Sequence, residues 1–242
     1  MPLSRTLFIS DLHLAEERPE TTARFERFLA GTLPGASALY ILGDLFEYWA
    51  GDDTLALPFE GRIGALLREA SRAVPVSFLH GNRDFVVGAA FSEATGVRVI
   101  PDPTVIDLAG TRAVLLHGDT LCTGDAAYQA FRAQVRDPRW QAAALARPPA
   151  ERLALARGMR QGSESAKGGK SESIMDVAPE AVESAFRASG CDLMIHGHTH
   201  RPARHVHAVD GRERVRWVLP DWYEGGGYLA AGPDGIEALP AD

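Results

Sequence analysis

The chain is 242 residues long, and its content of 45% hydrophobic and 24% charged residues excludes a wholly disordered protein. A net charge of −7 argues against general nucleic-acid binding, which usually requires a basic excess. Two cysteines, no evident signal peptide and no apolar run long enough to span a membrane lead us to expect a soluble, cytoplasmic protein without a disulfide framework.

Short apolar runs recur along the chain, and each ends in a polar cluster. Runs this short and this continuously hydrophobic are typical of strands buried on both faces. Helical patterns lie between some of them, since Phe25 and Phe28 share one face and Ile63 and Leu67 another. The alternation predicts an α/β fold with reactive side chains at the carboxyl ends of its strands. The predicted strands comprise residues 7–9, 39–42, 76–79, 113–116, 193–195, 215–219 and 227–230.

One long segment departs from this alternation. Residues 125–179 show no buried-strand pattern and are rich in Ala, Arg and Gln, with scattered large apolar residues. We predict a helical insertion over 125–179 that caps an α/β core made of residues 1–124 and 180–242.

Five polar clusters directly follow five of the predicted strands, each with a glycine nearby that allows close approach of the backbone. A mixture of carboxylate, amide and imidazole groups suits Mn, Fe or Zn better than Ca or Mg. Any one cluster could be ordinary turn chemistry, but five in order indicate a centre of two metal ions. The candidate ligands are Asp11, His13, Asp44, Asn82, His117, His198 and His200.

The order of these clusters resembles the calcineurin-like metallophosphoesterase superfamily. The resemblance implies an αββα sandwich of two mixed β-sheets flanked by helices, with the metal centre at the sheet edges. It also divides the ligands into two subsites bridged by Asp44: Asp11, His13 and His200 in one, and Asn82, His117 and His198 in the other.

Arg83 departs from the commonest form of the third cluster, in which a histidine often protonates an alkoxide leaving group. A guanidinium cannot act as a general acid, because its pKa exceeds about 12. A phosphate leaving group needs no such acid, and Arg83 could bind phosphate oxygens in a bidentate way. Arg83 therefore favours a pyrophosphate substrate, with pairing to Asp84 or another nearby acid as the alternative.

Longer blocks are closely similar to the UDP-2,3-diacylglucosamine pyrophosphatases of lipid A biosynthesis: residues 8–14, 40–47, 80–85, 117–123, 128–132 and 195–202. This resemblance implies hydrolysis of UDP-2,3-diacylglucosamine to UMP and 2,3-diacylglucosamine 1-phosphate (lipid X). We expect a metal-bound hydroxide to attack the α-phosphorus, with two divalent ions, normally Mn²⁺. We further expect a monomer that contacts the cytoplasmic face of the inner membrane peripherally and binds no nucleic acid.

The same resemblance assigns roles to individual residues. The expected catalytic residues are Asp44, Asn82, Arg83 and His117. The expected substrate contacts are Asn82, Arg83, Asp125, Tyr128, Ser163, Lys167, Lys170 and His198. For Asp125 and Tyr128 the alternatives are a helix N-cap and a core aromatic residue.

The predicted cap carries six cations and two acids between Arg147 and Lys170, which suits an anionic substrate with an apolar portion. The alternative is an ordinary solvated pair of amphipathic helices. Its apolar residues form an acyl-chain groove or the core of the cap itself, or, if partly exposed beside Arg147, Arg152 and Arg157, a surface that docks on an anionic membrane: Phe131, Trp140, Leu145, Leu153 and Leu155. A second cationic run, from Arg201 to Arg216, is expected to be a solvated hairpin.

Two other functions fit parts of these patterns. Another hydrolase of the superfamily, such as a cyclic-nucleotide phosphodiesterase or a protein phosphatase, would share the metal ligands, although Arg83 and the cap argue against it. A metal-free interaction scaffold on the same fold would typically have lost ligands, whereas all seven are present here.

Overall fold

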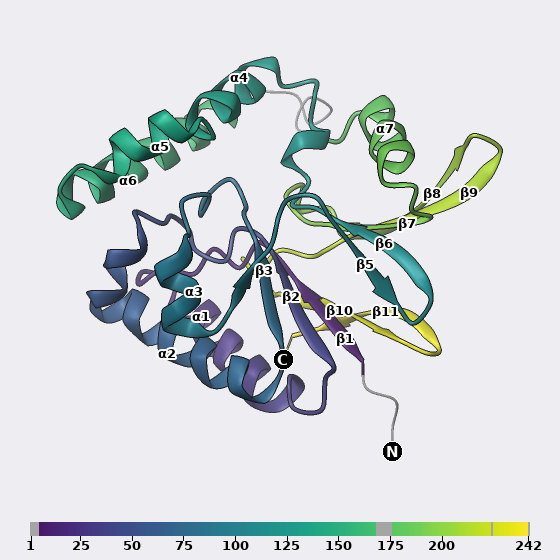
Figure 1. Cartoon of the computed structure of the whole chain (residues 1–242), viewed down its shortest axis with the longest axis horizontal. Coiled ribbons are helices and arrows are strands. Elements are labelled where there is room, and N and C mark those ends of the chain that lie inside the picture. Colours follow the sequence, from purple (N-terminus) through teal and green to yellow (C-terminus); the bar gives the residue numbers. More distant parts are fainter. Residues whose placement is uncertain (1–4, 168–175, 224, 242) are drawn as a thin grey trace.

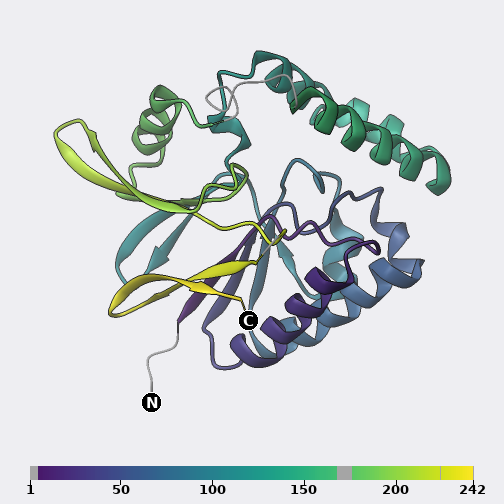
Figure 2. The same cartoon turned by 180° about the vertical axis from the view of Figure 1, so that it is seen from behind.

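The computed structural model describes residues 5–167, 176–223 and 225–241, without the side chains of residues 163–167. Two mixed β-sheets lie face to face, and helices cover their outer faces (Figure 1; Figure 2). The predicted αββα sandwich is therefore confirmed.

The first sheet has the strand order β11-β10-β1-β2-β3-β4. Its strands are β1 (Thr6–Ile9), β2 (Ala38–Leu42), β3 (Val76–Leu79), β4 (Arg98–Val99), β10 (Gly227–Gly232) and β11 (Gly235–Pro240). Strands β1 to β4 run parallel to one another, whereas β10 is antiparallel to both β1 and β11. The carboxyl ends of β1, β2 and β3 therefore meet at one edge.

The second sheet has the strand order β5-β6-β7-β9-β8. Its strands are β5 (Thr104–Leu108), β6 (Thr111–Leu115), β7 (Leu193–His196), β8 (Ala203–Val209) and β9 (Arg212–Val218). Strand β6 is parallel to β7, and β7 is parallel to β9, so the carboxyl ends of β6 and β7 also lie at one edge. The β8–β9 hairpin extends away from the rest of the molecule (Figure 2).

Side-chain alternation along the strands builds the layers. Phe8, Leu42 and Ile195 pack between the two sheets, whereas Ile9 and Phe78 point to the other side, beneath the helices of the first sheet. Those helices are α1 (Pro19–Arg27), continued by a π-helical turn η1 (Phe28–Thr32), α2 (Pro58–Ala73) and α3 (Ala89–Thr95). Helix α7 (Pro179–Ser189) covers the outer face of the second sheet.

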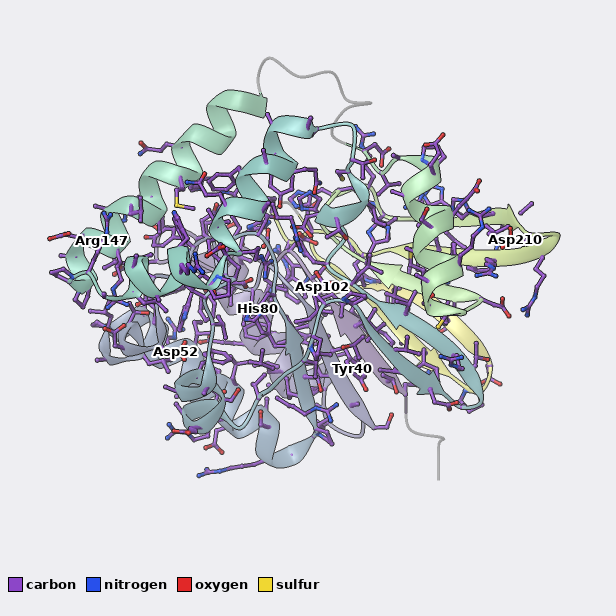
Figure 3. The ribbon with its side chains drawn as sticks, turned by 45° about the horizontal axis from the view of Figure 1, so that its top comes forward. Tyr40, Asp52, His80, Asp102, Arg147 and Asp210 are labelled. Atoms are coloured by element: carbon purple, nitrogen blue, oxygen red, sulfur yellow. The ribbon has the colours of Figure 1, made fainter. Side chains whose placement is uncertain are left out.

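Three helices lie across the strand ends, in the region where we predict a cap (Figure 1). They are α4 (Ala126–Val135), α5 (Pro138–Leu145) and α6 (Pro149–Lys167). Helix α6 is docked by Arg152, which is buried, donates to Ala50 O at 2.7 Å and pairs with Asp53. Arg147 lies at the exposed turn between α5 and α6, at the far end of the cap (Figure 3).

The expectation of a solvated second cationic run is wrong for Arg214 and Arg216, which are buried. The pleat of β9 directs both side chains to the face opposite Val215 and Trp217, and Arg214 there contacts Phe186 of α7. Arg214 Nη1 donates to the carbonyl oxygens of Phe186 and Cys191 at 2.6 and 3.1 Å. Arg216 Nη1 lies 3.0 Å from His196 Nε2.

None of the helices in the described ranges combines the length and apolarity needed to cross a bilayer.

Candidate metal centre

The seven predicted ligands come together where the carboxyl ends of five strands converge. Asp11 and His13 follow β1, Asp44 follows β2, and Asn82 follows β3. The second sheet contributes His117 after β6 and the pair His198 and His200 after β7. The site therefore lies at the seam between the two sheets, and both sheets supply ligands.

The backbone at this seam is held in a conformation that residues other than glycine rarely adopt. Positive φ angles of 50° to 69° occur at Asp11, His13, Asp44, His198 and His200. Such conformations cost of order 1 kcal/mol or more each and persist where the surrounding structure imposes them. Their concentration in five of the seven candidate ligands marks this edge as a functional site.

Two glycines allow the carboxylates to approach the neighbouring backbone. A Cβ at Gly81 would lie 2.0 Å from Asp44 Oδ1, and a Cβ at Gly197 would lie 2.1 Å from Asp11 Oδ2. Any side chain at either position would displace a candidate ligand. This explains the glycines beside Asn82 and His198 in the sequence.

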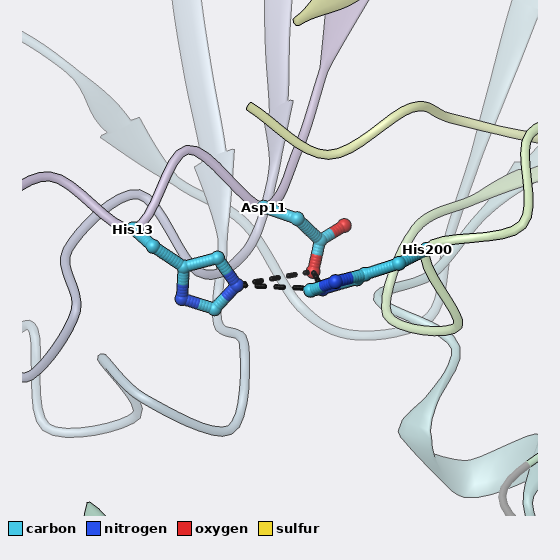
Figure 4. Close-up of side chains that lie close together, drawn as sticks. All are labelled: Asp11, His13 and His200. Atoms are coloured by element: carbon cyan, nitrogen blue, oxygen red, sulfur yellow. Dashed lines mark hydrogen bonds and ion pairs between the residues drawn. The ribbon is translucent and has the colours of Figure 1, made fainter. Parts of the chain in front are cut away.

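The first subsite is formed by Asp11, His13 and His200, which face one another (Figure 4). His200 Nε2 lies 3.4 Å from Asp11 Oδ1 and 3.4 Å from His13 Nε2. His13 Nε2 lies 3.9 Å from Asp11 Oδ1 and 3.8 Å from Asp44 Oδ2. These spacings leave room for one cation among the donor atoms.

The second subsite lies on the other side of Asp44. Asn82 Oδ1 is 3.0 Å from His117 Nε2 and 2.9 Å from His198 Nδ1. His117 Nε2 lies 3.7 Å from Asp44 Oδ1, whereas the Oδ2 atom of the same carboxylate faces His13. The two oxygens of Asp44 thus point to different subsites, which is the geometry that a bridging carboxylate requires.

Neighbouring groups fix the orientation of these side chains. Asp11 Oδ2 accepts hydrogen bonds from Ser10 Oγ at 2.6 Å and from the His198 N–H at 2.8 Å. His117 Nδ1 donates to Leu42 O at 2.9 Å, which leaves Nε2 to face the site. Such outer contacts are typical of ligands that are oriented before an ion binds.

The electrostatics of the site also favour cations. Burial raises the pKa of Asp44 to about 7 and lowers the pKa of His198 to about 3. Burial opposes the charged form of His117 as well, but the carboxylates of Asp44 and Asp11 outweigh it and raise the pKa of His117 to about 9. Divalent ions would relieve the repulsion between these buried carboxylates.

The donor set fits two divalent ions. Asp11 Oδ1 is buried and, within the described part of the chain, accepts no hydrogen bond of good geometry although it points into the first subsite. A buried carboxylate oxygen without a donor is costly unless a cation takes that place. The mixture of carboxylate, amide and imidazole groups is the one that Mn, Fe and Zn accept.

A cavity of about 580 Å³ extends from the ligands towards the cap helices. Its inner end is lined by His13, Asp44, Asn82 and His198, and its outer part by apolar residues of α4, α5 and α6. Phe131, Trp140, Leu145 and Leu155 line this outer part. The cavity thus combines a polar end at the candidate metal ligands with an apolar end under the cap.

The residues expected to contact substrate occupy different places. Asn82 and Arg83 line the cavity beside the ligands. Asp125 accepts from the Tyr128 N–H at 3.0 Å and is the N-cap of α4, yet it also lines the cavity. Ser163 and Lys167 belong to α6 but their side chains, like all of Lys170, lie outside the described structure.

Tyr128 also has a structural partner. Its hydroxyl donates to the buried Asp119 at 2.7 Å, and its ring centroid lies 5.9 Å from that of His198. Arg132 donates from Nε to the same carboxylate oxygen at 2.7 Å. Asp119 therefore holds α4 against the loop that carries His117.

The cap cations are partly used to dock the cap. Arg152 contacts Ala50 and Asp53, as described above, while Arg160 Nε donates to Glu47 Oε1 and Arg157 Nε donates to Tyr48 Oη at 3.2 Å. The local positive charge therefore serves the fold of the cap as well as any anionic ligand.

Three buried acids near the site are not among the predicted ligands, catalytic residues or substrate contacts. Glu47 lies 3.9 Å from His13, Asp119 holds Tyr128, and Asp84 accepts the backbone N–H of Leu45 at 2.7 Å and of Gly81 at 2.9 Å. Asp84 and Asp119 belong to the polar clusters that follow the strands, and Glu47 lies three residues beyond Asp44. Their position in or just after those clusters was the available signal, but only the folded backbone distinguishes an outer partner from a ligand.

Comparisons with known proteins agree with this geometry. Residues 4–202 match the family model described as calcineurin-like phosphoesterase. A UDP-2,3-diacylglucosamine hydrolase from Aromatoleum aromaticum is 52% identical over 94% of this chain and 94% of the relative. One from Xanthomonas campestris pv. campestris is 50% identical over 96% of each chain. The solved structure of the E. coli phosphoesterase Yfce aligns with a TM-score of 0.51 at 16% identity, covering 98% of this chain and 93% of that one, and bears on the fold alone.

Proposed function

The chain belongs to the calcineurin-like phosphoesterase family, and from this premise we propose that it is a UDP-2,3-diacylglucosamine hydrolase. It splits the pyrophosphate bond of UDP-2,3-diacylglucosamine into UMP and 2,3-diacylglucosamine 1-phosphate, a step of lipid A biosynthesis. The observation that carries the proposal is identity of about half of all positions over nearly the whole length of relatives with that name.

The cavity supports this substrate. A UDP-linked diacyl sugar has a charged pyrophosphate and two apolar chains, and the cavity is polar at the ligand end and apolar beneath the cap. Phe131, Trp140, Leu145 and Leu155 would contact the acyl chains there. This assigns the apolar residues of the cap to the ligand as well as to its own packing.

The two divalent ions, for which we propose Mn²⁺, would polarise the phosphoryl oxygens and make a bound water acidic enough to lose its proton near neutral pH. Asp11, His13 and His200 would hold one ion, Asn82, His117 and His198 the other, and Asp44 both.

Catalysis by the chain itself consists of orientation and charge stabilisation. Asn82 and Arg83 would bind the phosphate oxygens, with the guanidinium stabilising the charge that develops on the transferred phosphoryl group. Asp125, Tyr128, Ser163, Lys167, Lys170 and His198 are the further substrate contacts that we propose. Because the leaving group is a phosphate, Arg83 does not need to donate a proton.

We further propose that residues 125–179 act as a cap on the core formed by 1–124 and 180–242. The lipid substrate favours a monomer that associates peripherally with the cytoplasmic face of the inner membrane. Exposed Arg147 at the outer turn of the cap is a cation placed to meet anionic headgroups. Sedimentation of the protein with anionic vesicles, compared with neutral ones, tests that association.

The function is tested by release of UMP from UDP-2,3-diacylglucosamine with and without Mn²⁺. Wild type and Asp210→Asn should turn over, while Asp44→Asn should not; Asp210 is an exposed matched control at the hairpin tip, far from the cap (Figure 3). Cleavage of cyclic AMP or a phosphoprotein, with none of the UDP lipid, would instead identify a different phosphoesterase.

The direction of attack has its own test. Hydrolysis in ¹⁸O-labelled water should place the label in UMP, because we propose attack at the α-phosphorus. Label found only in the sugar phosphate would overturn that assignment and leave the substrate unchanged.

A further inference from the structure

Glu47 is a buried carboxylate that lies between a candidate metal ligand and the cap. Resting on the proposed function, we propose that Glu47 is a positioning residue through which helix α6 controls the metal affinity of the subsite that contains His13. The link runs from Arg160 of α6 through Glu47 to His13.

The contact between Glu47 and His13 is on the side of the ring that faces away from the subsite. His13 Nε2 points toward Asp11 and Asp44, whereas Nδ1 lies 3.9 Å from Glu47 Oε2. An imidazole that binds a cation through Nε2 carries its proton on Nδ1, and that N–H needs an acceptor. Nδ1 and Oε2 are both buried, and within the described residues neither atom makes a hydrogen bond of good geometry, although Arg18 Nη1 lies 3.2 Å from Oε2. A shift of about 1 Å would join them.

The other contacts of Glu47 determine where its carboxylate lies. Arg160 donates from Nε to Oε1 at 2.5 Å, and Arg18 Nη1 lies 3.2 Å from Oε2. The Arg18 guanidinium also stacks 4.2 Å above the ring of Tyr223, which in turn stacks on His13 at 4.7 Å. Arg18 and Tyr223 belong to the core, so Arg160 is the contact through which the cap acts on Glu47.

Because Glu47 is buried, its carboxylate depends strongly on the contact with Arg160. Its side chain is only 5% exposed, so the carboxylate depends on its two cations for stabilisation. Without Arg160, Oε1 would lose its charged partner, and the carboxylate would no longer be held in the orientation that presents Oε2 to His13. Docking of α6 therefore favours the His13 orientation that binds a cation, and a bound cation favours docking of α6 by the same factor.

Titration of the substrate-free protein with Mn²⁺, followed by electron paramagnetic resonance, measures this link without any turnover. Glu47→Gln should weaken binding at one of the two ions by roughly 10- to 100-fold, the usual effect of removing an outer partner. Arg160→Gln should weaken the same ion by about 5-fold or more, and Arg160→Lys should recover part of the loss. Arg157→Gln is the matched control, since it removes a cation of α6 that contacts Tyr48.

The converse measurement is hydrogen exchange of α6 residues 149–162, which Mn²⁺ should slow in wild type but not in Glu47→Gln. Thermal unfolding in EDTA verifies that each variant is folded. Equal Mn²⁺ affinity in wild type and Arg160→Gln, or equal weakening in Arg157→Gln, would overturn the inference and leave the proposed function standing. A wild-type protein that binds no Mn²⁺ would overturn both.

Discussion

Replacing the buried carboxylate of Asp44 by an amide should stabilise the metal-free protein while it abolishes hydrolysis. Burial raises the pKa of Asp44 from 3.8 to about 7, so folding disfavours the ionised form. The pKa of Asp44 is higher in the folded protein than in the unfolded one. The free-energy cost of ionising Asp44 in the folded protein is therefore absent below about pH 4, grows as pH rises, and is complete above about pH 7. A shift of about three pKa units corresponds to about 4 kcal/mol.

The amide retains the local contacts. The side chain introduced by Asp44→Asn keeps an oxygen that can accept the Arg83 N–H, which lies 2.8 Å from Asp44 Oδ1 in the wild type. The substitution also removes the charged neighbour of His117 at 3.7 Å, and losing that attraction destabilises the folded protein. The increase in the free energy of unfolding is therefore at most about 4 kcal/mol. The net effect on the metal-free protein remains stabilising, because burial is the largest influence on Asp44.

Urea unfolding in excess EDTA measures the difference. The free energy of unfolding of Asp44→Asn should exceed that of wild type by up to about 4 kcal/mol at pH 8 but by only about 1.5 kcal/mol at pH 5. The free energy of unfolding of the exposed control Asp210→Asn should stay within about 1 kcal/mol of wild type. In excess Mn²⁺ wild type should become the more stable of the two proteins. Bound metal should raise its free energy of unfolding by about 2.7 kcal/mol per site when the Mn²⁺ concentration is 100 times the dissociation constant. An Asp44→Asn protein less stable than wild type at pH 8 in EDTA would refute the reasoning.

Three further substitutions test separate parts of the structure. Gly81→Ala should displace Asp44 and weaken Mn²⁺ binding in calorimetry by roughly 10-fold or more, so an unchanged affinity would contradict the close packing. Tyr128→Phe removes a donor from the buried Asp119 carboxylate and should cost about 1.5–3 kcal/mol in urea unfolding; a neutral effect would mean that this hydrogen bond contributes little. Arg214→Met removes the Arg214 donor from Cys191 O and one of the donors from Phe186 O, which still accepts from the Gly190 N–H. The change should lower the unfolding free energy by about 1–3 kcal/mol, with Mn²⁺ affinity unchanged; a loss of Mn²⁺ affinity would show that Arg214 also supports the metal centre.

The sequence predicted those parts of the fold in which two signals coincide. Strands β1, β2, β3, β6 and β7 are buried on both faces, so their apolar runs are continuous, and each is followed by a polar cluster. The same coincidence predicted the candidate ligands, because parallel strands bring their carboxyl ends to one edge. Five of the seven candidate ligands have a strained backbone with positive φ, which no composition pattern reveals.

Strands β4, β5 and β8 lacked such a signal. Strand β4 has only two residues, and the edge strands β5 and β8 are half exposed and polar in part. Arg214 and Arg216 were assigned to solvent because charge normally indicates exposure, but carbonyl and imidazole acceptors satisfy them inside. The partners of the cap cations could not be read from the chain either, since Arg160 and Glu47 are 113 positions apart.

The seam position of the first subsite has a consequence for the integrity of the sandwich. His13 follows the first strand of one sheet, His200 follows a strand of the other, and 187 positions separate them along the chain. An ion held by both histidines would close a loop that contains most of the polypeptide. In a flexible chain, the entropic cost of closing such a loop rises with the logarithm of the loop length. Such an ion would act as a reversible cross-link between the sheets, so chelators should loosen the layer around Phe8 and Ile195 before they unfold the helices.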